Sequence, residues 1–285
     1  MRGIREIRRR IRSVESTKQI TKAMEMVAAA YLRRAQARVE AARPYSEKLR
    51  QILNSLAGAS DISHPLFEQR EVKNTAIVML TGDRGLCGSY NQNVIRATEI
   101  LLKEHSQDEV ELVTIGKRGR DYFRKRDWKI TAEHIDFGGR LDFERTQQIA
   151  KDATEMFLSG EVDEVKLIYT RFVSAVTFRV TVADFLPIAK PEVEEGAASL
   201  DYIYEPDSES IYAEILPKYI ENMVYIAFAE SLASEHGARM MAMGNATKNA
   251  EDMIDSLTLL RNKVRQASIT NELLDLVGGA EALKG

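Results

Sequence analysis

Residues 4–14, IREIRRRIRSV, decide the fold. Apolar side chains at positions 4, 7, 11 and 14 are separated by three, four and three residues, which is the spacing of a coiled-coil seam. The surrounding sequence has no glycine between Gly3 and Gly58 and is rich in residues that favour helices. We therefore predict that residues 1–60 form one long coiled-coil helix, in which residues 3–57 would span roughly 80 Å at about 1.5 Å per residue.

The seam changes character after Val14. It weakens over residues 15–19, and the next apolar row is out of phase: Ile20, Met24, Val27 and Tyr31. Further along, the seam is mostly alanine, at positions 28, 35 and 42, and such small side chains would let a partner helix approach closely. Pro44 is expected to kink or divide the helix.

The C-terminal segment, residues 208–285, predicts a second long helix. Its heptad seam contains Met240, Met243, Thr247, Ala250, Ile254, Leu257, Arg261 and Val264, with Thr247 and Arg261 as polar interruptions. Beyond residue 253 apolar residues occur on every face, as in a helix that is enclosed. We expect roughly the last 25 residues to be covered by another protein, because one partner helix covers only one side. The alternative, packing on the middle of the chain, would leave the N-terminal helix without a partner.

The middle segment, residues 74–205, alternates short apolar runs with helical patterns, which indicates a mostly parallel, Rossmann-like α/β domain. Strands are expected at 75–80, 110–115, within 129–135, at 164–172 and at 175–186, and helices at 88–104, 117–126 and 142–159. The last two strands would form a hairpin with its turn at Val173 and Ser174. The predicted fold class is α/β plus a long antiparallel coiled coil, made by the two chain ends, with the α/β domain inserted between them.

The two ends of the chain differ in charge. Residues 1–50 hold 14 Lys/Arg against 5 Asp/Glu, and residues 205–285 hold 7 against 13. This difference favours pairing of the two helices, although exposed ion pairs contribute little individually. Six arginines within residues 2–12 also suggest nucleic-acid binding, but aromatic residues to stack on bases are missing nearby. A solvated or partner-facing helix side is therefore the preferred interpretation, with no nucleic acid as a partner.

The composition predicts a protein that stays on the cytoplasmic side. No run approaches the roughly 18 consecutive apolar residues of a transmembrane helix. The N-terminal region lacks the apolar part of a signal peptide. The single cysteine, Cys87, excludes an internal disulfide and a cysteine-based zinc site.

A glycine-rich stretch, TGDRGLCGSYN at residues 81–91, follows the first expected strand. Such turns often hold a phosphate in α/β proteins. The spacing of Gly82, Gly85 and Gly88 matches neither G-x-G-x-x-G nor the P-loop, and Asp83 would repel a phosphate. We interpret the glycines as a tight strand-to-helix turn and expect no bound cofactor.

Other chemistry is not visible in the sequence. Histidines at positions 64, 105, 134 and 236 lack the spacing of metal ligands. Cys87 has no obvious base near it and is interpreted as a small core residue. We expect no metal site and no catalytic residue, so that the chain is not an enzyme by itself.

Three stretches together resemble the gamma subunits of bacterial F-type ATP synthases, and especially those of thermophilic Bacillus-type enzymes. They are IRRRIRSVESTKQITKAMEMVAAA at 7–30, the glycine-rich stretch at 81–91, and a segment at 233–283 that begins ASEHGARMMAM. The resemblance covers essentially the whole chain.

This resemblance implies a function. The chain would be the central rotor shaft that couples proton-driven rotation of the membrane c ring to ATP synthesis or hydrolysis in the catalytic ring. Its partners would be three alpha and three beta subunits, the epsilon subunit and the c ring. It would lie at the cytoplasmic face of the cell membrane as a peripheral protein, held there indirectly through the c ring.

The resemblance also implies which residues contact partners. Met24 would contact the beta subunits, and Arg265 and Gln266 would engage a loop of the catalytic ring. The apolar tip at residues 273–282, with Leu273 and Leu276, would be seated in the collar at the far end of the ring. The c ring would meet a third group of residues: Tyr202, Tyr204 and Glu205.

Two interpretations from other classes stay open at this point. One is a nucleotide-binding α/β regulator whose coiled-coil arms bind DNA or RNA, and the other is a simple coiled-coil adaptor. A nucleic-acid arm should end in basic residues, whereas residues 271–285 hold three acidic residues against Lys284. An adaptor would not need so apolar an end.

Overall fold

A computed structural model describes residues 2–59, 64–189 and 208–282. The chain divides into two compact units. The coiled-coil unit comprises Met1–Ala28 with Met240–Gly285, and the α/β unit comprises Ala29–Arg239. Two long helices contribute to both units, namely α1 (Arg2–Ala59) and α5 (Ser208–Ala282).

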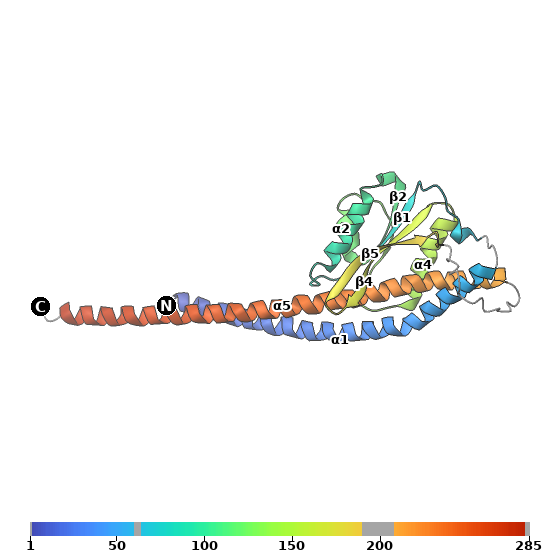
Figure 1. Ribbon diagram of the computed structural model, residues 1–285. Coiled ribbons are helices and arrows are strands. Elements are labelled where there is room, and N and C mark those ends of the chain that lie inside the picture. The colour runs from blue at the N-terminus through green and yellow to red at the C-terminus, as the bar shows by residue number, and fades with distance from the viewer. Residues whose placement is uncertain (1, 60–63, 190–207, 283–285) are drawn as a thin grey trace. The chain divides into compact units, whose positions relative to one another are not determined.

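The α/β unit is built on a five-stranded sheet with the order β3-β2-β1-β4-β5 (Figure 1). Its strands are β1 (Thr75–Leu80), β2 (Val110–Ile115), β3 (Ile130–His134), β4 (Glu164–Ser174) and β5 (Thr177–Leu186). The first four are parallel, and β5 pairs antiparallel with β4. This confirms the predicted mostly parallel sheet with a hairpin at its edge.

Helices cover both faces of this sheet, and β1 is therefore buried along its whole length. On one face lie α2 (Tyr90–Leu102) and α3 (Lys117–Arg124), around a core that includes Met79 and Phe123. On the other face α4 (Phe143–Leu158) packs with parts of α1 and α5, around a core that includes Leu80 and Phe157. Two short 3₁₀ helices, Pro65–Phe67 and Gln107–Glu109, complete the unit.

The hairpin turn lies two residues later than the sequence predicts. We expect it at Val173 and Ser174, and that prediction is wrong, because β4 continues to Ser174 and the turn is formed by Ala175 and Val176. Ser174 pairs with Thr177 across the hairpin, and its hydroxyl accepts the Val176 N–H at 3.3 Å. A side-chain bond of this kind stabilises a turn that begins at the serine.

Pro44 does not divide α1. Its side chain is exposed, so the backbone hydrogen bond that proline removes is lost on the solvent side of the helix. The flanking seam residues Ala42 and Ser46 are half-buried on the opposite side and continue the pattern across the proline.

The buried side of α1 follows one unbroken heptad pattern, which differs from the sequence prediction between Val14 and Ala28. The out-of-phase row does not form the seam, because Ile20 and Val27 are 58% and 55% exposed. The seam passes instead through polar residues that an apolar pattern does not reveal, namely Lys18, Thr21 and Glu25. Buried or half-buried residues occupy positions 4, 7, 11, 14, 18, 21, 25, 28, 32, 35, 39, 42, 46, 49, 53 and 56.

The seam predicted for α5 agrees with the structure. Met243, Thr247 and Ala250 are buried, and the remaining members from Met240 to Val264 are half-buried. Beyond Val264 nearly every side chain up to Gly279 is exposed. Among the described residues, no helix is both long enough and apolar enough to cross a lipid bilayer.

Candidate functional site

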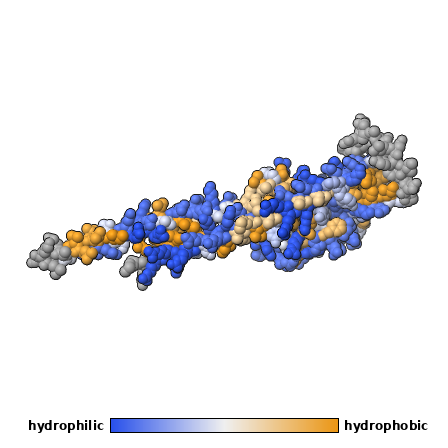
Figure 2. Space-filling view, turned by 90° about the horizontal axis from the view of Figure 1, so that it is seen from below, coloured by the Kyte–Doolittle hydropathy of each residue, from blue (hydrophilic) through white to orange (hydrophobic). Residues whose placement is uncertain are grey.

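An extended apolar surface is exposed at the end of α5, in the coiled-coil unit. Figure 1 shows α5 continuing past the first residues of α1, so among the described residues of its unit this part of the helix has no helical partner. Four large apolar residues there are between 57% and 70% exposed: Leu273, Leu274, Leu276 and Val277. Figure 2 shows hydrophobic residues gathered at one end of the coiled-coil unit. A helix with this surface is suited to contact another protein.

The other predicted contact residues lie at different positions along the axis of the coiled-coil unit. Arg265 and Gln266 are exposed on α5, and in the described part of the chain Arg265 forms no ion pair. Met24 is half-buried on α1, and its neighbour Glu25 lies against Gly244. Gly244 precedes Arg265 by about 20 residues, which is roughly 30 Å along a helix. The structure therefore does not bring Met24 together with Arg265 and Gln266.

The residues predicted to meet the c ring, Tyr202, Tyr204 and Glu205, lie outside the described residues. Their role stays a prediction.

The α/β unit has the place where a nucleotide would be sought in this class of fold. In open α/β sheets, ligands bind beyond the carboxyl ends of the strands, where the strand order reverses. Here that point lies between β1 and β4. It is filled by α5, because the Thr170 N–H donates to Ser231 Oγ at 3.1 Å and the Ser234 hydroxyl donates to the Thr170 carbonyl at 3.2 Å.

The glycine-rich turn is shaped to fit its neighbours within the chain. A Cβ atom on Gly82 would lie 2.9 Å from the Glu235 carboxyl carbon, and one on Gly85 would lie 2.9 Å from Arg118 Nη2. The Gly82 N–H donates to Asn91 Oδ1 at 2.8 Å. This amide and the space around these glycines are therefore used by the protein's own side chains.

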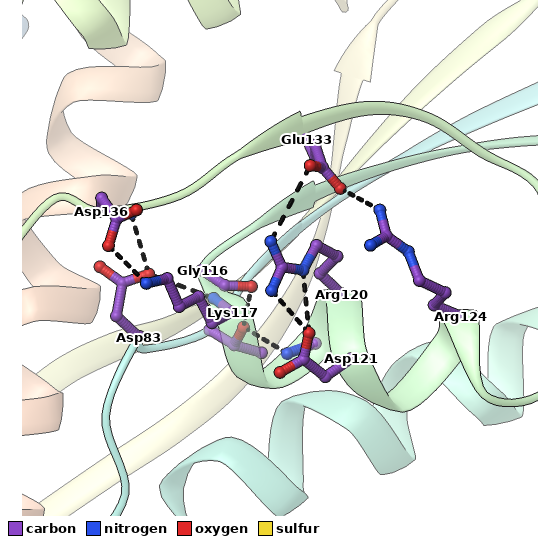
Figure 3. A network of polar contacts seen from close by, with 10 residues as sticks. Asp83, Gly116, Lys117, Arg120, Asp121, Arg124, Glu133 and Asp136 are labelled. Carbon is purple, nitrogen blue, oxygen red and sulfur yellow. Dashed lines mark hydrogen bonds and ion pairs between the residues drawn. The ribbon is translucent and has the colours of Figure 1, made fainter.

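Asp83 ties the carboxyl ends of three strands together (Figure 3). Its Oδ1 accepts the backbone N–H of Lys117 at 3.1 Å and that of Asp136 at 3.2 Å. Lys117 Nζ pairs with Asp136 Oδ1 at 2.6 Å. The sequence predicts that Asp83 would repel a phosphate. In the structure its carboxylate accepts backbone N–H groups at the carboxyl edge of the sheet.

Arginines on α3 extend this network. Arg120 pairs with Asp121 at 2.7 Å and lies 3.8 Å from Glu133, and Arg124 pairs with Glu133 at 2.6 Å. Figure 3 shows these side chains joining α3 to β3.

A buried polar cluster on α5 faces the glycine-rich turn. Arg239 contacts Glu235 one turn away on α5, and its Nη2 donates to the Gly85 carbonyl at 3.4 Å. Arg239 Nη1 also lies 3.3 Å from His236 Nδ1. His236 Nε2 lies 3.4 Å from the Gly139 carbonyl, and its ring stacks on Tyr31 of α1 with centroids 5.1 Å apart. Segments distant in sequence thus meet at this cluster.

Burial shifts the pKa values of Glu235 and His236 in this cluster. It raises the pKa of Glu235, and the Arg239 guanidinium opposes that rise. Burial and then the positive charge of Arg239 lower the pKa of His236 to about 4. His236 is accordingly neutral near pH 7, with Nε2–H donating to Gly139 and Nδ1 accepting from Arg239.

Cys87 is buried beside Tyr90 and Ala238, as predicted for a small core residue. Burial, followed by the nearby Glu235 carboxylate, raises the pKa of its thiol. A thiol with a raised pKa is a poor nucleophile. Across the described ranges, no three or more His, Cys, Asp or Glu side chains are grouped so as to hold a metal ion.

The sequence does not reveal the contact between the glycine-rich stretch and the ASEHGARMM segment, although each has a distinctive composition. The sequence signal for this contact is the composition of the α5 segment. Glu235, His236 and Arg239 interrupt a run of small and apolar residues on α5, and such charged interruptions need partners when buried.

Comparison with known proteins identifies relatives over the full length. The ATP synthase family model matches residues 3–283. The ATP synthase gamma chain of Moorella thermoacetica is 49% identical over 285 residues, and that of Pelotomaculum thermopropionicum is 46% identical, each covering 100% of both chains.

Solved structures agree with this relationship. A chain of the central stalk and c ring of the Tetrahymena thermophila mitochondrial ATP synthase is similar with a TM-score of 0.61 and 26% identity, covering 80% of this chain and 99% of that one. A chain of the Euglena gracilis mitochondrial ATP synthase gives a TM-score of 0.68 at 22% identity, covering 99% and 94%, and supports the fold.

Proposed function

Because this chain belongs to the ATP synthase gamma-chain family, we infer that it is the central rotor shaft of an F-type ATP synthase. It couples proton-driven rotation of the membrane c ring to ATP synthesis, or the reverse rotation to ATP hydrolysis, in the ring of three alpha and three beta subunits. The epsilon subunit and the c ring are its partners at the base. The observation that carries this proposal is the exposed apolar end of α5, which projects beyond its helical partner in the coiled-coil unit.

The proposed mechanism follows from the physical character of that end. A shaft inside a ring of repeated subunits has to turn past equivalent surfaces without being held at any one angle. Apolar contacts are not directional, so they allow rotation while excluding water. Arg265 and Gln266 lie just before the apolar end, where a few polar contacts could be made and broken once per step. We propose that Met24, Arg265, Gln266, Leu273 and Leu276 contact the ring in this way.

We also propose that the chain carries no catalytic site of its own. This is supported by the filled crevice of the α/β unit, where Ser231 and Ser234 of α5 bond to β4 and where Asp83 is engaged by backbone amides. ATP would then be made and hydrolysed on the surrounding ring. We place the chain at the cytoplasmic face of the cell membrane, attached through the c ring, because its relatives are bacterial ATP synthase gamma chains.

Reconstitution tests this function. The purified chain is mixed with alpha and beta subunits of the Moorella thermoacetica relative, and the products are weighed by native mass spectrometry. We expect one copy of the chain with three copies of each other subunit. Failure to form any complex with alpha and beta subunits would contradict the proposal.

A matched pair of variants then tests the apolar end. Leu273→Ser with Leu276→Ser should weaken the complex, because it removes apolar area from the proposed contact. Leu158→Ser removes a 46%-exposed leucine from α4 and should leave assembly unchanged. Equal assembly of both variants would show that the end of α5 is not the contact.

A further inference from the structure

Two polar pairs occupy seam positions of α1 and α5 where coiled coils usually carry apolar side chains. In the coiled-coil unit, Thr21 Oγ1 lies 2.9 Å from Thr247 Oγ1, and both residues are buried. In the α/β unit, Asn222 Nδ2 donates to Ser46 Oγ at 2.5 Å. Both pairs join the two long helices.

The two pairs obey one antiparallel register. The residue numbers of the partners add up to the same value, 268, for Thr21 with Thr247 and for Ser46 with Asn222. Within the coiled-coil unit, two neighbours keep that register to within one residue. Lys18 Nζ pairs with Glu251 at 2.8 Å, and the Glu25 carboxyl carbon lies 3.6 Å from where a Cβ on Gly244 would be.

The apolar part of the seam does not fix this register by itself. Its members recur every heptad as isoleucine, valine, alanine, methionine or leucine, so a shift of seven residues again places apolar on apolar. The polar positions do distinguish the registers. After such a shift Thr21 would face Ile254 or Met240, and in one direction Glu25 would face Glu251, which is a repulsive pair.

We propose that Thr21 and Thr247 are positioning residues that favour this register within the coiled-coil unit and thereby help to set how far the apolar end of α5 extends past α1. This inference rests on the proposed function as a rotor shaft. The observed register places Gln266 opposite the first residue of α1, so Arg265 and Gln266 mark the end of the paired region. A shift by one heptad would move them by about 10 Å relative to α1.

The hydroxyl contacts of Thr21 and Thr247 determine how strongly this pair favours the observed register. Thr21 Oγ1 is also 3.1 Å from the Lys18 carbonyl, and Thr247 Oγ1 is 2.9 Å from the Met243 carbonyl. Two hydroxyl protons cannot serve three contacts at once. In a shifted register each hydroxyl still has its own backbone carbonyl. The threonines therefore bias the register, and Ser46 with Asn222 adds a second bias of the same sense.

Disulfide trapping in the full chain tests whether the polar pairs determine the helix register. In all variants, Cys87→Ala removes the natural thiol. Cysteines at Ile7 and Arg261 report the observed register, and cysteines at Ile7 and Ile254 report a shift of one heptad in the direction that does not place Glu25 opposite Glu251. After mild oxidation, peptide mass spectrometry measures the yield of each disulfide. With all four polar residues present, we expect only the first disulfide.

Three variants make the result decisive. With Thr21→Val, Thr247→Val, Ser46→Ala and Asn222→Leu together, the yield of the first disulfide should fall severalfold and the second should appear. Thr21→Ser and Thr247→Ser, combined with Ser46→Ala and Asn222→Leu, restore only the hydroxyls of the first pair and should restore the original pattern. Ile11→Ala weakens the apolar seam but keeps both polar pairs, and should give no shifted disulfide.

The proposal is overturned if the fourfold variant still gives only the first disulfide, or if Ile11→Ala gives the second one equally. Circular dichroism first establishes that each variant is helical. If the fourfold variant does not fold, Thr21→Val with Thr247→Val alone is read by the same disulfides. No other subunit is needed, so this outcome is independent of whether the chain assembles with alpha and beta subunits.

Discussion

Arg239 Nη2 lies 2.5 Å from Glu235 Oε1 across one turn of α5, and the two side chains are only 13% and 9% exposed. The pair lies against the glycine-rich turn, where Gly82 leaves room for the Glu235 carboxylate and the Gly85 carbonyl accepts from Arg239. A buried ion pair is weak support for a fold but a strong constraint on it, because either charge alone would be left without compensation. The pair therefore specifies how the turn is seated on α5.

A single variant and a double variant should reveal this constraint. Arg239→Met leaves the Glu235 carboxylate buried without its cation and should lower the free energy of unfolding by about 3 kcal/mol. Adding Glu235→Gln to that variant removes the buried charge and should recover much of the loss. Urea unfolding measures both. Equal stability of the single and double variants would mean that the unpaired Glu235 carboxylate does not cause the loss of stability.

Stability should depend on pH through His236. Its pKa is lowered from 6.5 to about 4, so the folded state resists protonation. The stability provided by neutral His236 is complete above about pH 6.5 and is lost as the pH falls towards about 4, with a total of about 3 kcal/mol. Glu235 acts in the opposite direction, because its raised pKa favours proton uptake in the folded state.

The variant His236→Gln isolates this contribution, since glutamine can still donate to the Gly139 carbonyl but does not titrate. Urea unfolding at several pH values between about 4.5 and 7 should give a flatter profile for the variant than for the natural protein. Parallel profiles would assign the pH dependence to other groups.

Gly116 should not tolerate a side chain. Its φ is +89°, and a Cβ atom would lie 2.1 Å from the Thr81 carbonyl oxygen, which is part of the backbone and cannot move aside. Gly116→Ala should therefore destabilise the α/β unit by at least about 3 kcal/mol. Gly278→Ala is the matched control, because no atom of the described residues lies within 4 Å of its Cβ position. Thermal unfolding of the two variants should separate them clearly, and similar curves would contradict the assigned geometry.

Much of the fold could be predicted because its signals are local. An apolar run at residues 75–80 predicts β1, and a regular alternation of three-residue and four-residue steps predicts the seam of α5. Both patterns can be recognised without knowing which distant residues they contact. The middle of the α1 seam could not be predicted in the same way. Lys18, Thr21 and Glu25 occupy it, and their places depend on partners such as Glu251 and Thr247 that lie more than 200 residues away.

The same distinction, between local signals and contacts with distant residues, applies to the candidate sites. The apolar end of α5 was predictable, because apolar residues on every face of a helix indicate a covered surface wherever the helix lies. The cluster around Glu235 and His236 was not, because its polar residues are explained only by the backbone of the glycine-rich turn and by the Gly139 carbonyl. Contacts of this kind depend on tertiary structure alone.

The last prediction concerns Arg265 and Gln266, which lie exposed at the end of the paired region of the shaft. Replacing both by alanine should lower the ATP turnover of the reconstituted complex roughly tenfold, as expected from losing one charge-assisted hydrogen bond of about 1.5 kcal/mol in a rate-determining step. Assembly should be retained, because the apolar end is unchanged. Lys263→Ala is the matched control, since it removes an exposed positive charge one turn or less away and should leave turnover intact. If the double variant turns over at the natural rate, the two residues make no contact that matters for rotation. A loss of assembly in the double variant would instead make them part of the static seat of the shaft.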